Sequence, residues 1–213
     1  MSDVKTRPES HLDRNTGTIR GARAAAPQLS ATECPIEAIY EEHFNQRQLC
    51  ADMEALAAAT RPRPELARRI LTNLCRDLPM HFRDEEEGLF PRLRARASPE
   101  DELEKTLTRL AREHEIAETA FALLVPALAC MADGALPAPE DRDALCRLAA
   151  SERRHLIVEN AILLPLARLR LTEQDKTALM AEMRERRAPP PRFDSACARA
   201  LARIDAASPG DQS

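Results

Sequence analysis

Several features that would point to other classes of protein are missing from this chain of 213 residues. It has no tryptophan, one tyrosine and five glycines, and Ala, Leu, Glu and Arg dominate, as is typical of helical bundles. No apolar run approaches the roughly 20 residues of a membrane span, so we expect neither a transmembrane helix nor a signal peptide. The formal net charge is only -4, with both signs interleaved, which argues against a nucleic-acid surface. The composition indicates a soluble, all-α protein with no nucleic-acid or membrane partner.

The cysteines lack any spacing that would define a metal or disulfide framework. No C-x-x-C pair occurs among Cys34, Cys50, Cys75, Cys130, Cys146 and Cys197. A zinc ribbon and a secreted disulfide scaffold are therefore not indicated, and we expect reduced thiols in a cytoplasmic protein. Cys50 lies seven residues after His43, on the same predicted face. Packing is the favoured role for Cys50, and a redox role is the alternative.

Helix-period patterns predict an up-down-up-down four-helix bundle with an additional C-terminal helix and disordered tails. Residues 1–33 show no periodicity and are expected to form a disordered tail that includes His11. A bundle is expected over 34–171, and its helices are predicted at about 35–60, 64–96, 98–134 and 139–170. In the remaining segment, 172–213, a capping pattern predicts a fifth helix to about Arg187, then a mobile tail with a helical turn near 196–204.

The apolar stripes of these helices pass through polar residues. The stripe of the third helix is predicted to include His114 and Glu118, and that of the fourth continues after Glu159 through Ile162 and Leu169. Pro79 lies inside the second helix and is expected to kink it.

Four histidines fall one to each predicted helix, at matching depths. His43 and His81 each lie 17 residues from the loop between them, and His81 and His114 each lie 15 residues from the next loop. Across the third loop the separations are 20 residues for His114 and 16 for His155. Antiparallel neighbours place such residues at about one level. The four imidazoles are therefore predicted to converge inside the bundle.

Two glutamates and an internal repeat accompany the histidines. The second and fourth helices share histidine, glutamate, leucine and proline at offsets 0, 4, 8 and 10, starting at His81 and His155, and the first and third each carry a Glu-His pair. Glu85 and Glu159 therefore lie on the same helix faces as these histidines, displaced in the same direction. Two helix pairs related by a pseudo-twofold axis would produce this pattern. Two metal ions sharing both carboxylates would remove the cost of burying these groups.

Other polar residues near the seam admit simpler roles. A single His-x-x-x-Glu pair often only stabilises an exposed face, so a metal site is indicated only by the joint occurrence of the four histidines and the two glutamates. Glu86 and Glu87 are expected on a solvated acidic face. Glu152 is either a hydrogen-bond partner of a ligand or a surface carboxylate. Tyr40 is expected at the edge of the core, and a hydrogen bond to a metal-bound species is its alternative role.

The ordered set of these residues resembles the hemerythrin HHE cation-binding family over about residues 35–170. The matching residues are His43, His81, Glu85, His114, His155 and Glu159. The resemblance implies two non-haem iron ions, one on His43 and His81 and one on His114 and His155, bridged by Glu85 and Glu159. Manganese and zinc also suit such ligands.

The pattern departs from that of the oxygen-carrying hemerythrins. They have a second histidine one turn after that of the third helix, where this chain has Glu118, a possible additional ligand. The set is instead similar to di-iron proteins implicated in repairing iron-sulfur centres, but residues 1–33 are too short for their cysteine-bearing N-terminal domain.

The expected function is binding or reduction of O2, NO or peroxide in oxidative or nitrosative stress or iron homeostasis. An iron- or oxygen-responsive sensor or scaffold with a protein partner, and an iron donor for iron-sulfur repair, are the alternatives. A catalytic di-iron oxygenase is a further alternative, for which the sequence offers no substrate pocket. Whether the protein is an enzyme is left open at this stage.

Overall fold

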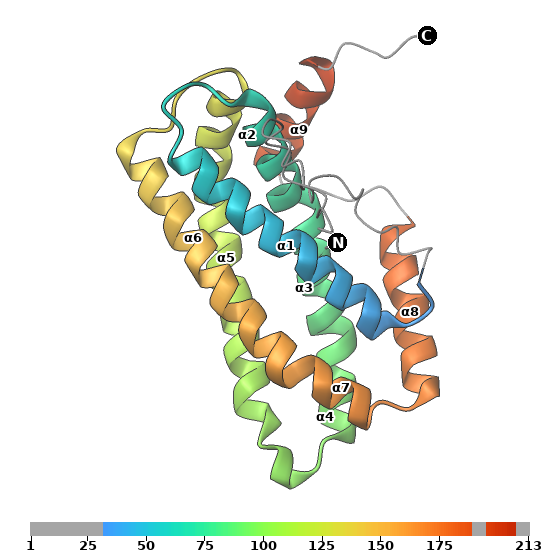
Figure 1. The fold of residues 1–213 in the computed structure, drawn as a ribbon. Helices are drawn as coiled ribbons and strands as arrows, with labels where there is room; N and C mark the ends of the chain where they lie inside the picture. The colour runs from blue at the N-terminus through green and yellow to red at the C-terminus, as the bar shows by residue number, and fades with distance from the viewer. Residues whose placement is uncertain (1–31, 189–194, 208–213) are drawn as a thin grey trace, which may run out of the picture.

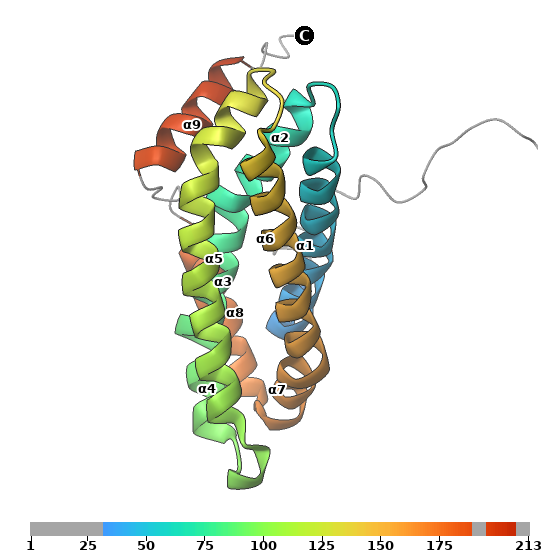
Figure 2. The ribbon, with the colours of Figure 1, turned by 90° about the vertical axis from the view of Figure 1, so that its left-hand side faces the viewer.

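Four long helical rods form the body of the molecule (Figure 1). The computed structural model describes residues 32–188 and 195–207, and these contain helices and connections but no strand. The rods run alternately up and down; the first and fourth slant across the second and third in Figure 1, and a quarter turn shows all of them following the long axis of the molecule (Figure 2). The chain is thus the predicted all-α, up-down-up-down bundle.

The first rod is one helix, whereas the second and fourth are built from several segments. The first rod is α1 (Pro35–Ala57). The second consists of α2 (Pro64–Thr72), η2 (Asn73–Asp77), α3 (Leu78–Arg83), η3 (Asp84–Leu89) and α4 (Phe90–Arg96). The third is α5 (Leu103–Ala132), preceded by the short 3₁₀ turn η4 (Pro99–Asp101), and the fourth is α6 (Pro139–Val158), η5 (Glu159–Leu163) and α7 (Leu164–Arg170).

Proline sets where three rods begin. Pro35, Pro64 and Pro139 are the first residues of α1, α2 and α6. At that position the missing N–H would have had no intrahelical partner, and the fixed φ already suits the helix. The helix starts predicted at these three residues are confirmed.

Proline also accompanies the wide π-helical turns that interrupt the second and fourth rods. η2, η3 and η5 each end two residues before a proline, namely Pro79, Pro91 and Pro165. A proline inside a helix removes one hydrogen bond and collides with the carbonyl four residues earlier, and a π-turn is one way to relieve both. Pro126 lies within the unbroken α5, so proline alone does not require a π-turn.

The π-turn η5 changes which side chains of the fourth rod face inward. The predicted stripe placed Ile162 and Leu169 in the core, but they are 49% and 72% exposed, while Leu163 and Ala167 are buried. A π-turn inserts extra length into the helix, so every later residue rotates relative to the α-helical register. The prediction for these two residues was wrong for that reason.

The apolar core is divided into two clusters by a polar layer. The upper cluster lies toward the α1–α2 loop and includes Met53, Leu74 and Leu128. The lower cluster lies toward the α4–α5 connection and includes Ile39, Leu93 and Leu107. Buried histidines and carboxylates occupy the middle of the rods between them.

Two further helices pack on the outside of the bundle. α8 (Glu173–Arg187) begins at a capping box between Thr172 and Asp175, as predicted. It buries Leu179, Met180 and Met183 in the lower cluster. α9 (Ser195–Ala207) packs near the opposite end, against α5 and α2 (Figure 2). Residues 1–31 of the predicted tail at 1–33, and residues 189–194 and 208–213 of the predicted C-terminal tail, lie outside the described residues.

A disulfide fastens α9 to the second rod. Cys75 in η2 is bonded to Cys197 in α9, across 122 residues of sequence. The expectation of six reduced thiols was therefore wrong for this pair. The sequence gives no sign of it because neither spacing nor periodicity shows that two distant segments lie together.

α5 is, by length and composition, apolar enough to cross a membrane, and it is the one helix in the described part of the chain with that property. We did not expect such a segment from the sequence. Its Leu107, Phe121 and Leu128 face the interior of the bundle. A core helix of a bundle meets the same criterion because it is long and rich in Ala and Leu.

Candidate metal centre

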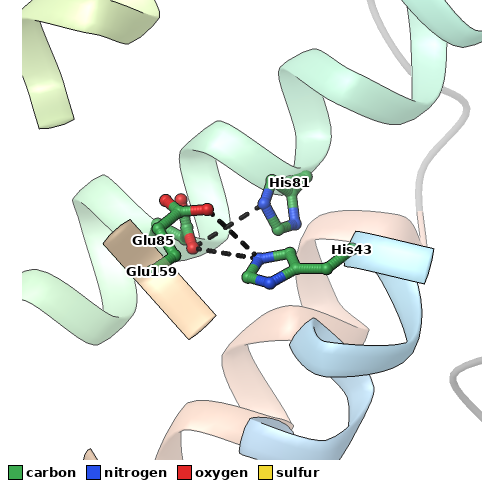
Figure 3. Close-up of side chains that lie close together, drawn as sticks. All are labelled: His43, His81, Glu85 and Glu159. Atoms are coloured by element: carbon green, nitrogen blue, oxygen red, sulfur yellow. Dashed lines mark ion pairs between the residues drawn. The ribbon is translucent and has the colours of Figure 1, made fainter. Parts of the chain in front are cut away.

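The four predicted histidines and both predicted glutamates meet in the polar layer. His43 comes from α1, His81 from α3, His114 from α5 and His155 from α6, and none is more than 3% exposed. Glu85 and Glu159 are fully buried beside them. Figure 3 shows the rings of His43 and His81 directed toward these two carboxylates.

Each carboxylate offers one oxygen to each pair of histidines. Glu85 Oε1 lies 3.8 Å from His43 Nε2 and 3.7 Å from His81 Nε2, while its Oε2 lies 3.4 Å from His114 Nε2. Glu159 Oε2 lies 3.4 Å from His43 Nε2, and its Oε1 lies 2.8 Å from His155 Nε2. The two carboxylates therefore stand between the two histidine pairs.

The side chains form two groups that share both glutamates. One group contains His43 and His81 with Glu85 and Glu159, and the other contains His114 and His155 with the same carboxylates. In each group the four ligand atoms lie within 4.8 Å of one another. Ligand atoms that share one ion with bonds of about 2 Å lie at most about 4 Å apart, so small side-chain movements would bring each group onto a single ion.

A ring of hydrogen bonds holds the outer nitrogen of every imidazole. Each partner lies next to a group member in sequence, and each rod supplies the partner for the histidine of the next rod. The four contacts from Nδ1 are His81 to Glu42 at 2.9 Å, His114 to Glu86 at 2.7 Å, His155 to Glu113 at 2.9 Å and His43 to Asn160 at 3.2 Å. An acceptor at Nδ1 keeps the proton there and turns the Nε2 lone pair inward.

The inward-facing atoms have few partners of their own. Nε2 of His43 and of His81, both oxygens of Glu85 and Oε2 of Glu159 are buried without a hydrogen bond, and Oε1 of Glu159 has only its 2.8 Å ion pair with His155 Nε2. Nε2 of His114 lies 2.9 Å from Nε2 of His155, a contact that needs a proton or a cation between two lone pairs. Buried polar groups are normally paired. The donor set therefore fits metal cations.

Neighbouring carboxylates raise the pKa values of His81 and His155. Burial alone lowers the pKa of His81, but the charges of Glu85 and Glu42 raise it to about 9. Burial likewise opposes protonation of His155, and Glu159 raises its pKa to about 10. In the absence of metal the carboxylates thus favour the doubly protonated, positively charged form of these two imidazoles. A metal ion has to displace a proton from each in order to bind.

Both central glutamates lie at the start of π-turns. Glu85 is the second residue of η3, and Glu159 is the first of η5. π-turns occur often at functional sites. The sequence predicted the i, i+4 relation of these glutamates to His81 and His155 but not the wider turns that begin there.

Three glutamates at the edge of the layer can be compared with what the sequence predicts for them. Glu118 is exposed and belongs to neither group, because Ala117 takes the inward position one turn after His114. Glu86 is exposed, as expected, and it also accepts a hydrogen bond from His114. Glu152 is only 4% exposed, yet its Oε2 has no partner, and burial raises its pKa.

Tyr40 and Cys50 do not join the groups. Tyr40 is 44% exposed with Arg168 over its ring, which fits the expected position at the edge of the core. Cys50 is fully buried in the upper apolar cluster, and burial raises the pKa of its thiol to about 12. That environment favours packing over redox chemistry.

Ion pairs connect α8 to the histidine layer. Arg187 donates to Glu42 Oε1 over 2.8 Å, and Glu42 in turn accepts from His81. The neighbouring Arg186 donates to the buried Asp84 over 2.7 Å, and Arg187 also pairs with Asp84. A helix outside the four rods therefore holds one of the groups that orient the histidines.

A buried layer of four histidines around two shared carboxylates defines a four-helix protein built to hold metal cations. The family model of the hemerythrin HHE cation binding domain matches residues 34–167. The chain belongs to this family. A comparison with curated proteins found no match to the chain.

Proposed function

We propose that the protein holds a non-haem di-iron centre that binds or reduces a small ligand such as O2, NO or peroxide. The observation that carries this proposal is the pair of four-residue groups that share Glu85 and Glu159. Mixed imidazole and carboxylate ligation suits iron, although manganese and zinc accept the same donors. When bound, such a pair of ions supplies Lewis-acid and redox chemistry to an oxygen-containing ligand.

The residues of the chain divide the remaining work. His43 and His81 would hold one ion, His114 and His155 the other, and Glu85 and Glu159 both. The ring of partners at Nδ1 fixes the tautomer of each imidazole. The two apolar clusters on either side exclude bulk water from the layer.

The enclosure of the centre favours a small exogenous ligand. The six central side chains are at most 3% exposed, so a bulky organic substrate would have to separate the rods to reach them. Each group offers four donor atoms, which leaves coordination positions open on an ion that accepts six. These points support a diatomic or peroxide ligand over the substrate of an oxygenase.

Spectra and metal analysis of protein purified without added metal test the proposal. We expect about two iron atoms per chain, an oxo-bridge charge-transfer band in the oxidised protein, and changes in the spectrum on adding azide, NO or peroxide. A protein that contains iron but has no such band and shows no response to any of the three would contradict it.

A second candidate is an iron-responsive sensor that acts through a protein partner. The observation in its favour is the link from His81 through Glu42 to Arg187 on α8. Iron removal should then increase hydrogen exchange in α8, and Arg187→Gln should abolish that difference. Arg184→Gln is the control, because Arg184 lies at a neighbouring α8 position and its hydrogen bond among the described residues goes to the Thr32 carbonyl. Equal exchange in α8 with and without iron would exclude this mechanism.

The cellular setting of the centre is also part of the proposal. We place it in the cytoplasm, in oxidative or nitrosative stress or in iron homeostasis, where donation of iron to iron-sulfur repair is an alternative role. The Cys75–Cys197 disulfide is of a kind that oxidising compartments preserve. Trapping of free thiols in intact cells tests this location: Cys75 and Cys197 trapped as thiols would fit the cytoplasm, whereas an intact disulfide would count against it.

A further inference from the structure

The ring of partners at the outer histidine nitrogens contains one exception. Three of its four acceptors are carboxylates, from Glu42, Glu86 and Glu113, whereas the fourth is the amide of Asn160. The amide makes the longest of the four contacts, at 3.2 Å.

The exception breaks the internal repeat of the chain. The repeat relates His43 to His114, His81 to His155 and Glu85 to Glu159. It relates Glu42 to Glu113 in the same way, since each precedes a histidine directly. The residues that follow the two central glutamates also correspond, and they are Glu86 and Asn160. The ring is therefore symmetric except at this position.

The orientation of the Asn160 amide is fixed by a second hydrogen bond. Its Nδ2 donates to the Leu156 carbonyl over 2.7 Å, so its Oδ1 faces His43 Nδ1. Asn160 thus serves as a neutral acceptor for His43, in the place where a carboxylate serves His114.

A neutral acceptor makes imidazole a weaker ligand than a carboxylate does. A carboxylate at Nδ1 draws the proton toward itself and raises the basicity of the inward nitrogen. Loss of such an outer partner commonly costs 10- to 100-fold in metal affinity. His43 and His81 together have one carboxylate partner, and its charge is offset by Arg187.

The other histidine pair is supported more strongly. His114 and His155 have two carboxylate partners, of which Glu113 is also paired with Arg109 and Glu86 is not paired with a cation that the structure records. Phe82 stacks on the His114 ring at 3.9 Å between centroids. These contacts hold the second pair in a fixed orientation.

We propose that the two metal positions are unequal, with the ion at His43 and His81 held more weakly and exchanged first because Asn160 replaces a carboxylate. This inference rests on the proposed two-metal centre and adds the order in which its positions fill and empty. Asn160 is a positioning residue in this scheme, since it acts through His43.

Anaerobic titration of the metal-free full chain with Fe(II) and a competing chelator tests the inference. We expect two ions to bind, with dissociation constants that differ by about 10-fold or more. Crystals grown with one equivalent of Fe(II) should show anomalous scattering mainly at His114 and His155. Equal constants, or first filling at His43 and His81, would overturn the inference.

Two substitutions should change different dissociation constants in this titration, and each constant is called a step below. Asn160→Asp completes the ring and should tighten the weaker step about 10-fold, while Glu113→Gln should weaken the tighter step about 10-fold. Asn73→Asp is the matched control, because Asn73 makes the same amide bond to the carbonyl four residues earlier, at Arg69, but touches no histidine. It should leave both steps unchanged.

The outcomes separate this inference from the proposed function. If Asn160→Asp fails to fold, the Glu113→Gln variant and the half-loaded crystals still test whether the two metal positions are unequal. Glu113→Gln is expected to fold, since Gln matches Glu in shape. Movement of the weaker step by Glu113→Gln would contradict the assignment. Binding of no metal by the native chain would defeat the proposed function itself, whereas two equal ions would defeat only the inequality.

Discussion

Glu85 and Glu159 are the residues on which both halves of the centre depend, because each presents one oxygen to each histidine pair. Most other residues of the layer serve one half only. The loss of a shared carboxylate should therefore affect both ions, whereas the loss of one histidine should affect mainly one.

Replacing Glu85 with glutamine should reduce bound iron from two atoms per chain to one or fewer. An amide offers one neutral oxygen and cannot compensate the charge of two cations. Metal that binds only the folded state stabilises it, so the rise in melting temperature on adding iron should also shrink. Glu87→Gln changes an exposed residue paired with Arg83 and is the control. A Glu85→Gln protein that still binds two ions would rule out a bridging role.

Cys50 should not react with thiol reagents in the native protein. Burial raises the pKa of its thiol to about 12, so thiolate is scarce at pH 8, and the side chain is fully enclosed. Cys130 and Cys146 are exposed and should be alkylated rapidly. Mass spectrometry of peptides after brief iodoacetamide treatment measures all three. Rapid labelling of Cys50 would revive the redox role.

The sequence predicts the six central side chains better than it predicts the residues that hydrogen-bond to the histidines. The six central side chains could be found because helical spacing determines which residues share a face, and equal loop distances determine their level. Glu86 looks like part of a charged surface because three glutamates follow one another. Its contact with His114 depends on how two rods are rotated, which periodicity does not determine. The paired Glu-His dipeptides were the one available signal for Glu42 and Glu113.

Among the elements, the π-turns and the position of α8 could not be predicted from the periodicity of the sequence. The starts of the rods follow from local signals, proline at the first turn and capping residues. The π-turns depend on how the helix accommodates an internal proline, and Pro126 shows that the same residue can be tolerated without one. The position of α8 follows from tertiary packing against η3.

Gly88 in η3 leaves the space that α8 occupies. A Cβ at this position would lie 2.5 Å from Leu179 Cδ1 and 3.0 Å from Arg186 Nη2. Gly→Ala inside a helix normally stabilises by about 0.5–1 kcal/mol, but overpacking costs about 1–3 kcal/mol. Leu179 is enclosed in the core and Arg186 is paired with Asp84, so neither atom moves away freely. Gly88→Ala should therefore destabilise the protein by up to about 2 kcal/mol.

A double-mutant cycle with Leu179→Ala isolates the contact at Gly88. In that background the nearest atom is removed, so Gly88→Ala should cost less than it does in the native chain. Urea unfolding of the four proteins gives the required free energies. Additive effects of the two substitutions would show that α8 does not depend on the small residue at this position.

At the scale of the whole molecule, the family domain and the added helices meet at both ends of the bundle. The match to the family ends at residue 167, yet α8 contributes to the lower core cluster and α9 to the upper one. The rods alone thus leave part of each cluster uncovered. The C-terminal segment is expected to contribute to stability as well as to the contacts around the centre.

The disulfide between Cys75 and Cys197 should provide a measurable part of this stability. It closes a segment of 122 residues, and cross-links of this kind typically stabilise by about 2–4 kcal/mol, mainly by restricting the unfolded chain. Cys197→Ala should lower the free energy of unfolding by that amount. Dithiothreitol should have the same effect on the native protein and little further effect on the variant.

Cys146→Ala removes an exposed free thiol and should behave like the native protein in both conditions. Metal content separates an effect on α9 from an effect on the centre. Cys75 lies in η2, a different segment of the rod from the one that carries His81, so the Cys197→Ala protein should still bind two ions. If reduction left stability unchanged, the bond would not be formed in solution, and the expectation of reduced cytoplasmic thiols would return. If stability fell and iron was also lost, the bond would be holding the second rod in the register that the histidines require.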